Sequence, residues 1–216
     1  MTKLSGPMLA PRSGGAPTRI VVLLHGYGSD GRDLIDLGGA WGQVLPGALF
    51  VAPNAPLPCD GNPYGFQWFP LLVDRIAGRI EGAREAAPVI EEFLNDLWAA
   101  TGLGAADTVL VGFSQGAMMA LHVGTALDQT LAGVIAFSGA LVPAERFGQE
   151  GVGKPPVALI HGDLDAVVDP AMSREAAELL TANGFEVSYH RSPTLAHGID
   201  NDGLSFATSF LLARLG

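Results

Sequence analysis

The chain has 216 residues, which is enough for one well-buried domain and short for two. It is 48% hydrophobic and 16% charged, a balance that excludes a disordered chain and favours a globular protein with a large core. Its 12 basic and 22 acidic residues give a net charge of −10, which argues against nucleic acid and anionic membranes as partners because both attract clustered Lys and Arg.

Six short runs rich in Val, Ile, Leu and Phe are predicted to be strands. Five of them are apolar on both faces, as expected of parallel strands that helices cover on each side. In the last run apolar and polar residues alternate, which favours a strand near the edge of the sheet. In chain order the runs are 20–24, 48–52, 108–113, 134–137, 157–160 and 185–189.

Helical periodicity lies between these runs. Ser29 or Asp30 is suited to cap a helix after the first strand. An apolar stripe with a spacing near 3.6 residues predicts a helix through Ile90–Trp98, and Pro88 is expected to start or kink it. Three further helices are predicted at residues 115–127, 170–182 and 204–212.

This alternation predicts an α/β fold, with a mostly parallel central sheet, right-handed crossovers and helices on both faces. The sequence shows no internal repeat and no linker, so we expect residues 1–216 to form a single domain. Two stretches, 53–72 and 142–156, lack periodicity. Loops of that length in a compact domain are often functional.

The strongest chemical signal is the run Gly-Phe-Ser-Gln-Gly at Gly112–Gly116. It follows a buried strand directly and opens a helix, which is the setting of a nucleophile elbow, a sharp and strained turn that exposes its serine. The residues two before and two after that serine must lack bulk, and Gly112 and Gly116 meet this need. Ser114 is therefore the candidate nucleophile. The alternative is that the run is only a flexible turn.

A serine nucleophile needs a base, and in this fold a histidine after a later strand supplies it. Of the five histidines, only His197 lies in a flexible loop at the right place, after the last predicted strand. His25 precedes the nucleophile in sequence, and His161 ends a strand. His122 and His190 are expected to be structural or solvated.

The base in turn needs a carboxylate that orients it. Asp163, Asp165 and Asp169 all follow the strand 157–160, where the acid is expected. Asp163 is suited to cap the turn and Asp169 to cap the next helix. Asp165 lies deeper in the loop, is followed by apolar residues that can cover it, and is favoured.

Two backbone N–H groups are expected to hold the oxyanion that forms during acyl transfer. One belongs to Gln115, the residue after the nucleophile, at the positive end of its helix. The other is assigned to Tyr27, in the glycine-rich turn at residues 25–31. This turn also contains Gly-x-Gly-x-x-Gly, but a dinucleotide site requires an acidic residue at the next strand end, where Asn54 stands.

The sequence resembles the phospholipase/carboxylesterase family of α/β-hydrolases in four motifs, at residues 25–31, 112–116, 161–165 and 195–197. The resemblance extends from about Ile20 to the C-terminus. It implies a compact α/β-hydrolase fold, no cofactor, a catalytic triad of Ser114, Asp165 and His197, and Tyr27 and Gln115 as the oxyanion donors. The run Gly-Phe-Gln-Trp-Phe-Pro at residues 65–70 is more similar to the bacterial carboxylesterase branch than to the acyl-protein thioesterases.

We therefore expect a serine carboxylesterase that hydrolyses short- to medium-chain acyl esters through an acyl-enzyme. One alternative is a lysophospholipase or an acyl-(protein) thioesterase, which differs in leaving group and acyl length. A more distant alternative is a non-catalytic hydrolase-fold module that binds a ligand. The order Ser, Asp, His argues against the module, because a binding protein has no need of all three.

The substrate cleft is expected to be open. Residues 138–156, which separate the strand after the elbow helix from the strand before the acid, are too few for a large cap domain. The apolar walls are assigned to Trp68, Phe69, Leu71, Leu141, Val142 and Val167. The alternative for Trp68 and Phe69 is that they anchor their loop to the core.

Cys59 is the one cysteine, which excludes an intramolecular disulfide and a thiolate zinc site. No secretory signal is visible, and no apolar run approaches the ~20 residues of a membrane span. We expect a cytoplasmic protein that acts on a small-molecule ester, without a metal ion, nucleic acid or stable membrane association. A homodimer is compatible with the sequence.

Overall fold

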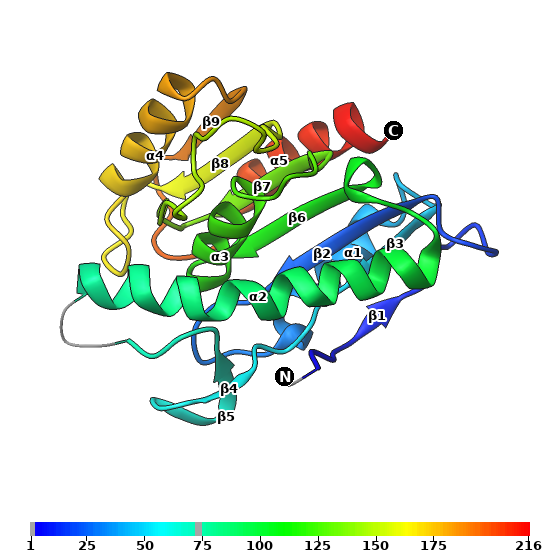
Figure 1. Ribbon diagram of the computed structural model, residues 1–216, viewed down its shortest axis with the longest axis horizontal. Helices are drawn as coiled ribbons and strands as arrows, with labels where there is room; N and C mark the ends of the chain where they lie inside the picture. Colours follow the sequence, from blue (N-terminus) through cyan, green and yellow to red (C-terminus); the bar gives the residue numbers. More distant parts are fainter. Residues whose placement is uncertain (1–2, 72–74) are drawn as a thin grey trace.

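A seven-stranded sheet forms the centre of the computed structural model, which describes residues 3–71 and 75–216 (Figure 1). The strands lie in the order β1-β3-β2-β6-β7-β8-β9, and every neighbouring pair is parallel except β1 with β3. The strand order reverses between β2 and β6, the kind of position at which α/β sheets bind ligands. The strands are β1 (Met8–Leu9), β2 (Arg19–Leu24), β3 (Ala48–Val51), β6 (Thr108–Phe113), β7 (Gly133–Phe137), β8 (Val157–Gly162) and β9 (Val187–Ser192).

The α/β fold predicted from the sequence is confirmed, and all six predicted strands are present. The run with alternating polarity forms β9, which lies at the edge of the sheet. β9 begins two residues later than predicted because Phe185 still takes part in the turn that follows the preceding helix, where its N–H donates to Leu180 O at 3.1 Å. The two-residue strand β1 has no sequence signal and was not predicted.

Helices cover both faces of the sheet (Figure 1). On one face lie α2 (Arg75–Thr101), α3 (Gln115–Gly124) and α4 (Ala171–Ala182), and on the other lie α1 (Gly31–Trp41) and α5 (Asn201–Leu215). A short 3-10 turn, η1 (Ala105–Asp107), precedes β6. α1 begins where predicted, since Asp30 caps it by accepting a hydrogen bond from Arg32 N–H at 2.7 Å.

Of the two outcomes predicted for Pro88, a helix start is wrong. The 27-residue helix α2 begins at Arg75 and contains Pro88 in its interior. Pro88 is exposed, so the carbonyl that lacks its usual N–H partner faces water. The buried side chains of Ala83, Ala87 and Ile90 continue across the proline at helical spacing, and this packing holds the helix together.

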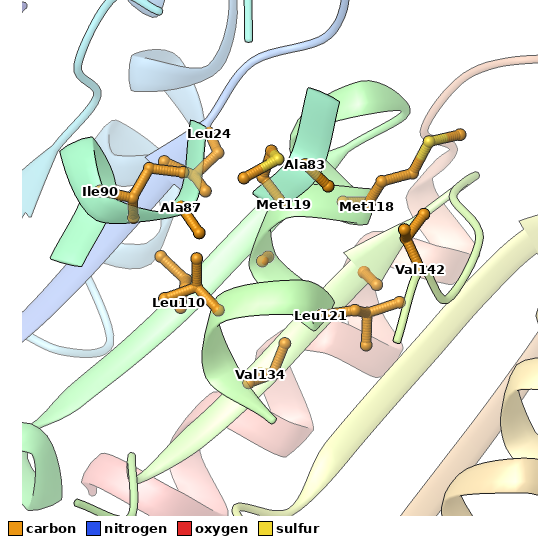
Figure 2. Packing of buried hydrophobic residues seen from close by; sticks show 14 of the residues in the cluster. Leu24, Ala83, Ala87, Ile90, Leu110, Met118, Met119, Leu121, Val134 and Val142 are labelled. Atoms are coloured by element: carbon orange, nitrogen blue, oxygen red, sulfur yellow. The ribbon is translucent and has the colours of Figure 1, made fainter. Parts of the chain in front are cut away.

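Alternating strand residues divide the core into two clusters, one on each face of the sheet. On β2, for example, Val22 and Leu24 belong to the cluster under α2, α3 and α4, whereas Val21 and Leu23 belong to the other. Figure 2 shows where α2, α3 and the sheet meet in the first cluster, with side chains that include Ala87, Ile90, Met119, Leu24, Leu110 and Val134. Burying each large side chain contributes about 1.5–3 kcal/mol, which fixes α3 against β6 and thereby the turn between them.

The aperiodic stretch 53–72 contains a hairpin that the sequence did not predict, formed by β4 (Leu57–Cys59) and β5 (Asn62–Gln67). The last residue of the stretch, Leu72, lies outside the described residues. The hairpin is fastened to the turn after β2, because Gly28 N–H donates to Phe66 O at 2.9 Å and Phe66 N–H donates to Ser29 O at 2.8 Å. The two chains lie so close that a Cβ on Gly65 would be 2.1 Å from Gly28 O.

The second aperiodic stretch, 142–156, has neither helix nor strand, as predicted. The same holds for the whole connection 138–156 between β7 and β8. The fold therefore has no cap domain inserted at this point, which leaves the carboxyl ends of the strands accessible from outside.

Candidate active site

Ser114 lies on a tight turn between β6 and α3, with φ 53° and ψ −116°, a backbone conformation that L-residues rarely adopt. Two glycines permit this turn. A Cβ on Gly112 would be 2.2 Å from Gly116 O, and one on Gly116 would be 2.0 Å from Leu24 O. Both distances are far below contact, so the predicted need for small residues has a direct steric cause.

His197 lies beside this serine, in the loop after β9. Its Nε2 is 3.0 Å from Ser114 Oγ, which is hydrogen-bond distance. The imidazole packs against the ring of Phe113, with the ring centroids 4.9 Å apart. His197 is therefore within reach of the Ser114 proton, as a general base must be.

Asp165 completes a hydrogen-bonded chain from the loop after β8. Its Oδ2 is 2.7 Å from His197 Nδ1, and its side chain is fully buried. Its Oδ1 accepts from the backbone N–H groups of Val167 at 2.8 Å and Val168 at 2.9 Å. Burial alone raises the pKa of Asp165, but the hydrogen bonds from His197 and these N–H groups outweigh it and leave the pKa below its usual value. Asp165 is thus held as a carboxylate.

The other two candidate aspartates face elsewhere. Asp163 forms a bidentate ion pair with Arg191, at 2.9 Å to Nε and 2.8 Å to Nη2. Asp169 accepts from Ala171 N–H at 2.9 Å, at the first residue of α4, which begins one residue later than predicted and has Pro170 rather than Asp169 as its N-cap. In the part of the chain that the structure describes, Asp165 alone among the three contacts His197.

His161 is a contact that sequence reasoning missed. The sequence indicates no role of its own for this histidine, yet its Nε2 is 3.1 Å from Asp165 Oδ2 and 3.0 Å from Val168 O. On the other side of the ring, Nδ1 is 2.6 Å from Ser173 Oγ on α4. The signal that was available is its position four residues before Asp165, at the end of a buried strand.

The remaining histidines take no part in the hydrogen bonds that join Ser114, His197 and Asp165. His25 is buried beneath the turn after β2, where Nδ1 donates to Gly26 O at 2.7 Å and Nε2 accepts from Ala55 N–H at 2.9 Å. Burial lowers its pKa, and that of His122, which donates to Val142 O at 2.8 Å. His190 stacks on the ring of Phe206. His25 and His122 thus have structural hydrogen bonds.

The turns that carry Tyr27 and Gln115 both line the cavity at Ser114. Among residues 3–71 and 75–216, no acceptor is bonded to the backbone N–H of either residue, so both donors remain for a ligand. The side chain of Gln115 is buried and occupied elsewhere, since Oε1 accepts from Trp68 N–H at 2.9 Å and Nε2 donates to Phe69 O at 2.7 Å. The Tyr27 hydroxyl lies against the hairpin, where a Cβ on Gly61 would be 3.2 Å from it, and the neighbouring Cys59 side chain raises the pKa of Tyr27.

A cavity of about 630 Å³ opens at Ser114. Of the predicted apolar walls, Leu71 and Val167 line it, and both are exposed. Met118 of α3, which was not predicted, forms part of its floor and is almost fully buried. Leu141 and Val142 instead line a neighbouring groove with Met172.

Trp68 and Phe69 are buried and do not line this cavity. Trp68 Nε1 donates to His25 O at 2.9 Å, and a Cβ on Gly82 would be 2.5 Å from the Cβ of Phe69, so both rings are enclosed. These contacts correspond to the alternative in which the two residues anchor their loop. Cys59 is buried and likewise does not line the cavity.

Across residues 3–71 and 75–216, no group of three or more His, Cys, Asp or Glu side chains is arranged to hold a metal ion. Within those same residues, none of the helices has the length and apolar character needed to cross a membrane.

Comparison with known proteins places these features in context. A family model described as Phospholipase/Carboxylesterase matches residues 11–215. Esterase YpfH of Escherichia coli is 32% identical over 198 residues, and the alignment covers 89% of this chain and 82% of the E. coli protein. Acyl-protein thioesterase 1 of Neurospora crassa is 29% identical, covering 97% and 91%. The crystal structure of esterase PE8 is similar with a TM-score of 0.95 and 55% identity, covering 99% of this chain and 100% of that one.

Proposed function

The chain belongs to the phospholipase/carboxylesterase family, and from this we propose that it is a serine carboxylesterase with Ser114 as its nucleophile, acting on short- to medium-chain acyl esters. It is a hydrolase that acts on carboxylic ester bonds. The observation that supports the role of Ser114 is the unbroken series of hydrogen bonds from Ser114 Oγ through His197 to Asp165. The Ser114 end of this series lies at an open, mainly apolar cavity.

In the first half of the reaction, His197 Nε2 takes the proton of Ser114 Oγ as that oxygen attacks the ester carbonyl. Asp165 holds Nδ1–H of the imidazole and so presents Nε2 as the acceptor. The same carboxylate stabilises the imidazolium that forms. The imidazolium then protonates the departing alcohol, and the acyl group stays on Ser114.

The tetrahedral intermediate carries a negative oxygen, which the N–H groups of Tyr27 and Gln115 receive. Both groups line the cavity next to Ser114. Gln115 is the first residue of α3, so the helix dipole adds positive potential there. One such donor typically contributes about 10²–10³ in kcat.

Deacylation reverses these steps with water as the nucleophile. His197 Nε2 takes a proton from the water as it attacks the acyl carbonyl. The imidazolium then returns that proton to Ser114 Oγ as the bond between Oγ and the acyl carbon breaks, which releases the carboxylic acid. The connection 138–156 carries no cap, so water reaches the acyl-enzyme from the open side of the cavity.

An acyl thioesterase is a second candidate, favoured by the similarity to acyl-protein thioesterase 1 over 97% of this chain. The chemistry would be the same, with a thiol in place of the alcohol as leaving group. The two functions therefore differ in the substrate, and matched oxygen and sulfur esters of one acyl chain distinguish them.

The test of the proposed function is a fluorophosphonate probe together with p-nitrophenyl butyrate. We expect the wild type to be labelled and to turn over the ester, and Ser114→Ala to lose labelling and at least about 10⁴-fold in kcat. Ser138→Ala is a matched control, because Ser138 also has a positive φ but lies after β7 and contacts Gly198 O rather than His197. Residual activity of Ser114→Ala above about a tenth of wild type would overturn the mechanism.

A further inference from the structure

Asp165 is held by two imidazoles rather than one. His197 Nδ1 approaches its Oδ2 at 2.7 Å from the cavity side, and His161 Nε2 approaches the same oxygen at 3.1 Å from the core side. The side chains of His161 and Asp165 are both fully buried. The mechanism of ester cleavage uses His197 and leaves His161 without a part.

The hydrogen-bond partners of His161 determine which of its nitrogens carries a proton. Nε2 faces two groups that only accept, Asp165 Oδ2 and Val168 O, so Nε2 must be protonated. Nδ1 faces Ser173 Oγ at 2.6 Å, a hydroxyl that donates to a neutral ring or accepts from a charged one. In the charged state, the Ser173 hydroxyl proton still has an acceptor, Gly139 O at 3.2 Å. His161 therefore presents an N–H to Asp165 in either state.

This donor acts on Asp165 in two ways. It completes a set of four hydrogen bonds, two on each carboxylate oxygen, that fixes the plane of the carboxylate beneath His197. It also stabilises the negative charge on the oxygen that His197 contacts, and so weakens the attraction of that oxygen for the His197 proton. A base whose proton is held less tightly stays free to a lower pH.

We propose that His161 is a positioning residue for ester hydrolysis, which orients Asp165 and lowers the affinity of His197 for its proton. The proposal rests on the proposed function, because it concerns the rate and pH dependence of the same reaction. It assigns His161 no contact with the substrate, since its side chain lies behind Asp165 and outside the cavity lining.

Further charged groups line or flank the site. Arg79 lines the cavity, and Asp169 lies on the outer side of the Asp165 loop. The ion pair of Asp163 and Arg191 spans the turn after β8 and strand β9. On α4, which packs behind His161, Arg174 and Glu175 follow Ser173 and are exposed. All of these are unchanged in the variants below, so a change in the pH profile reports on His161.

The test compares His161→Asn with His161→Gln. The amide of Asn reaches about as far as Nδ1, so it keeps the contact with Ser173 and withdraws the donor from Asp165. The longer Gln places its amide near Nε2 and restores that donor. For His161→Asn we expect kcat/KM to fall on the order of 10- to 100-fold, mainly through kcat, because the base is no longer held in place. We also expect the acid limb of the kcat/KM profile to move up by roughly half a pH unit. His161→Gln should regain most of both.

His122→Asn is the matched control, since His122 is also buried and hydrogen-bonded but contacts Val142 O rather than Asp165. It should change stability and leave the acid limb in place. An acid limb that coincides in wild type and His161→Asn, or an equal loss in the Asn and Gln variants, would overturn the proposal. Failure of the wild type to hydrolyse any ester or to react with the fluorophosphonate would instead overturn the proposed function.

A measurement on the unmodified protein guards against variants that fail to fold. In ¹⁵N-labelled wild type, the imidazole nitrogens of His161 report their protonation directly. We expect Nε2 to be protonated at neutral pH, and an unprotonated Nε2 would overturn the proposal even if no variant could be purified.

Discussion

Gln115 and Trp68 are joined by a buried hydrogen bond, in which Trp68 N–H donates to Gln115 Oε1 at 2.9 Å. The amide nitrogen of the same side chain donates to Phe69 O at 2.7 Å. Gln115 thus has two separate tasks. Its side chain holds the loop after β5, while its backbone N–H remains at the cavity beside Ser114.

Replacing this side chain should therefore destabilise the protein without removing the nucleophile. Gln115→Ala leaves Trp68 N–H and Phe69 O buried and unpaired, at about 1–3 kcal/mol each, so we expect a loss of roughly 2–6 kcal/mol in the free energy of unfolding. Urea unfolding measures this, and fluorophosphonate labelling of Ser114 should persist. Gln43→Ala, at an exposed position, should change stability by less than about 0.5 kcal/mol. Equal stability of the two variants would contradict the structural task of Gln115.

Asp165→Asn should abolish most activity, whereas Asp163→Asn should not. An amide at 165 favours the wrong imidazole tautomer and cannot stabilise the imidazolium, a loss of about 10⁴-fold in kcat for triads of this kind. Asp163 pairs with Arg191 at the surface, so its neutralisation removes an exposed ion pair of little energy. Steady-state kinetics with one ester compares them. If Asp163→Asn were the inactive variant, the assignment of the acid would be wrong.

Stability should fall as the pH drops below about 6.5. Burial lowers the pKa of His25 and His122 in the folded protein, so the unfolded chain binds protons on them first, at its usual value of 6.5. Each contributes up to about 1.4 kcal/mol of lost stability per pH unit below that value. The pKa of Asp165 is lowered for a different reason, because hydrogen bonds to its charged form outweigh the effect of burial. The stability that this carboxylate contributes is lost only in acid, below the usual carboxyl pKa of 3.8.

Urea unfolding near pH 7.5 and near pH 5.5 isolates the histidine range, because carboxylates remain ionised across most of it. His122→Asn should show a smaller dependence on pH than the wild type. A free energy of unfolding that stays constant between the two conditions would contradict the buried neutral histidines.

Acyl chain length should affect kcat/KM with an optimum. Each CH₂ that enters the cavity contributes up to about 0.8 kcal/mol, as far as the apolar lining extends. In a p-nitrophenyl series without detergent, we expect kcat/KM to rise from acetyl to butyryl or hexanoyl esters and to fall by palmitoyl. A palmitoyl optimum, or a jump in rate above the micelle threshold, would favour the lysophospholipase or thioesterase activity.

Two variants locate the chain-length effect. Val167→Ala changes an exposed wall of the cavity and should shift the optimum with little loss of stability. Trp68→Ala should instead lose about 3–5 kcal/mol of stability, because the ring is enclosed in the core. If Trp68→Ala remained stable and changed the chain-length profile, Trp68 would belong to the substrate site after all.

The sequence predicted those parts of the site whose geometry is local or follows from chain order. The elbow follows from a local motif, in which Gly112 prevents a clash with Gly116 O inside the turn and Gly116 lets the turn approach Leu24 O of the neighbouring strand β2. The positions of Asp165 and His197 follow from parallel strands whose carboxyl ends meet at one edge of the sheet.

Features that depend on long-range contacts could not be predicted. The ring of Trp68 points inward because of two distant residues. Gln115, 47 residues away, binds the backbone N–H of Trp68, and the carbonyl of His25, 43 residues away, binds the indole N–H. α2 continues through Pro88 because Ala83, Ala87 and Ile90 pack against the sheet and α3, and no local signal overrides the proline. The contact of His161 with Asp165 likewise depends on how the loop after β8 closes over it.

The floor and the rim of the cavity belong to different parts of the molecule. Met118 lies in the floor and in the main hydrophobic cluster, at 5% exposure, whereas Val167 lies on the rim at 65% exposure. Selection for a new ester can therefore act on the rim while the fold stays intact, because substitutions there disturb no packing. A larger floor carries a penalty of about 2–5 kcal/mol for Met→Ala, a large part of the total stability of a domain this size. The acyl specificity of this cavity can therefore change at its outer edge before any residue of the core beneath Ser114 has to change.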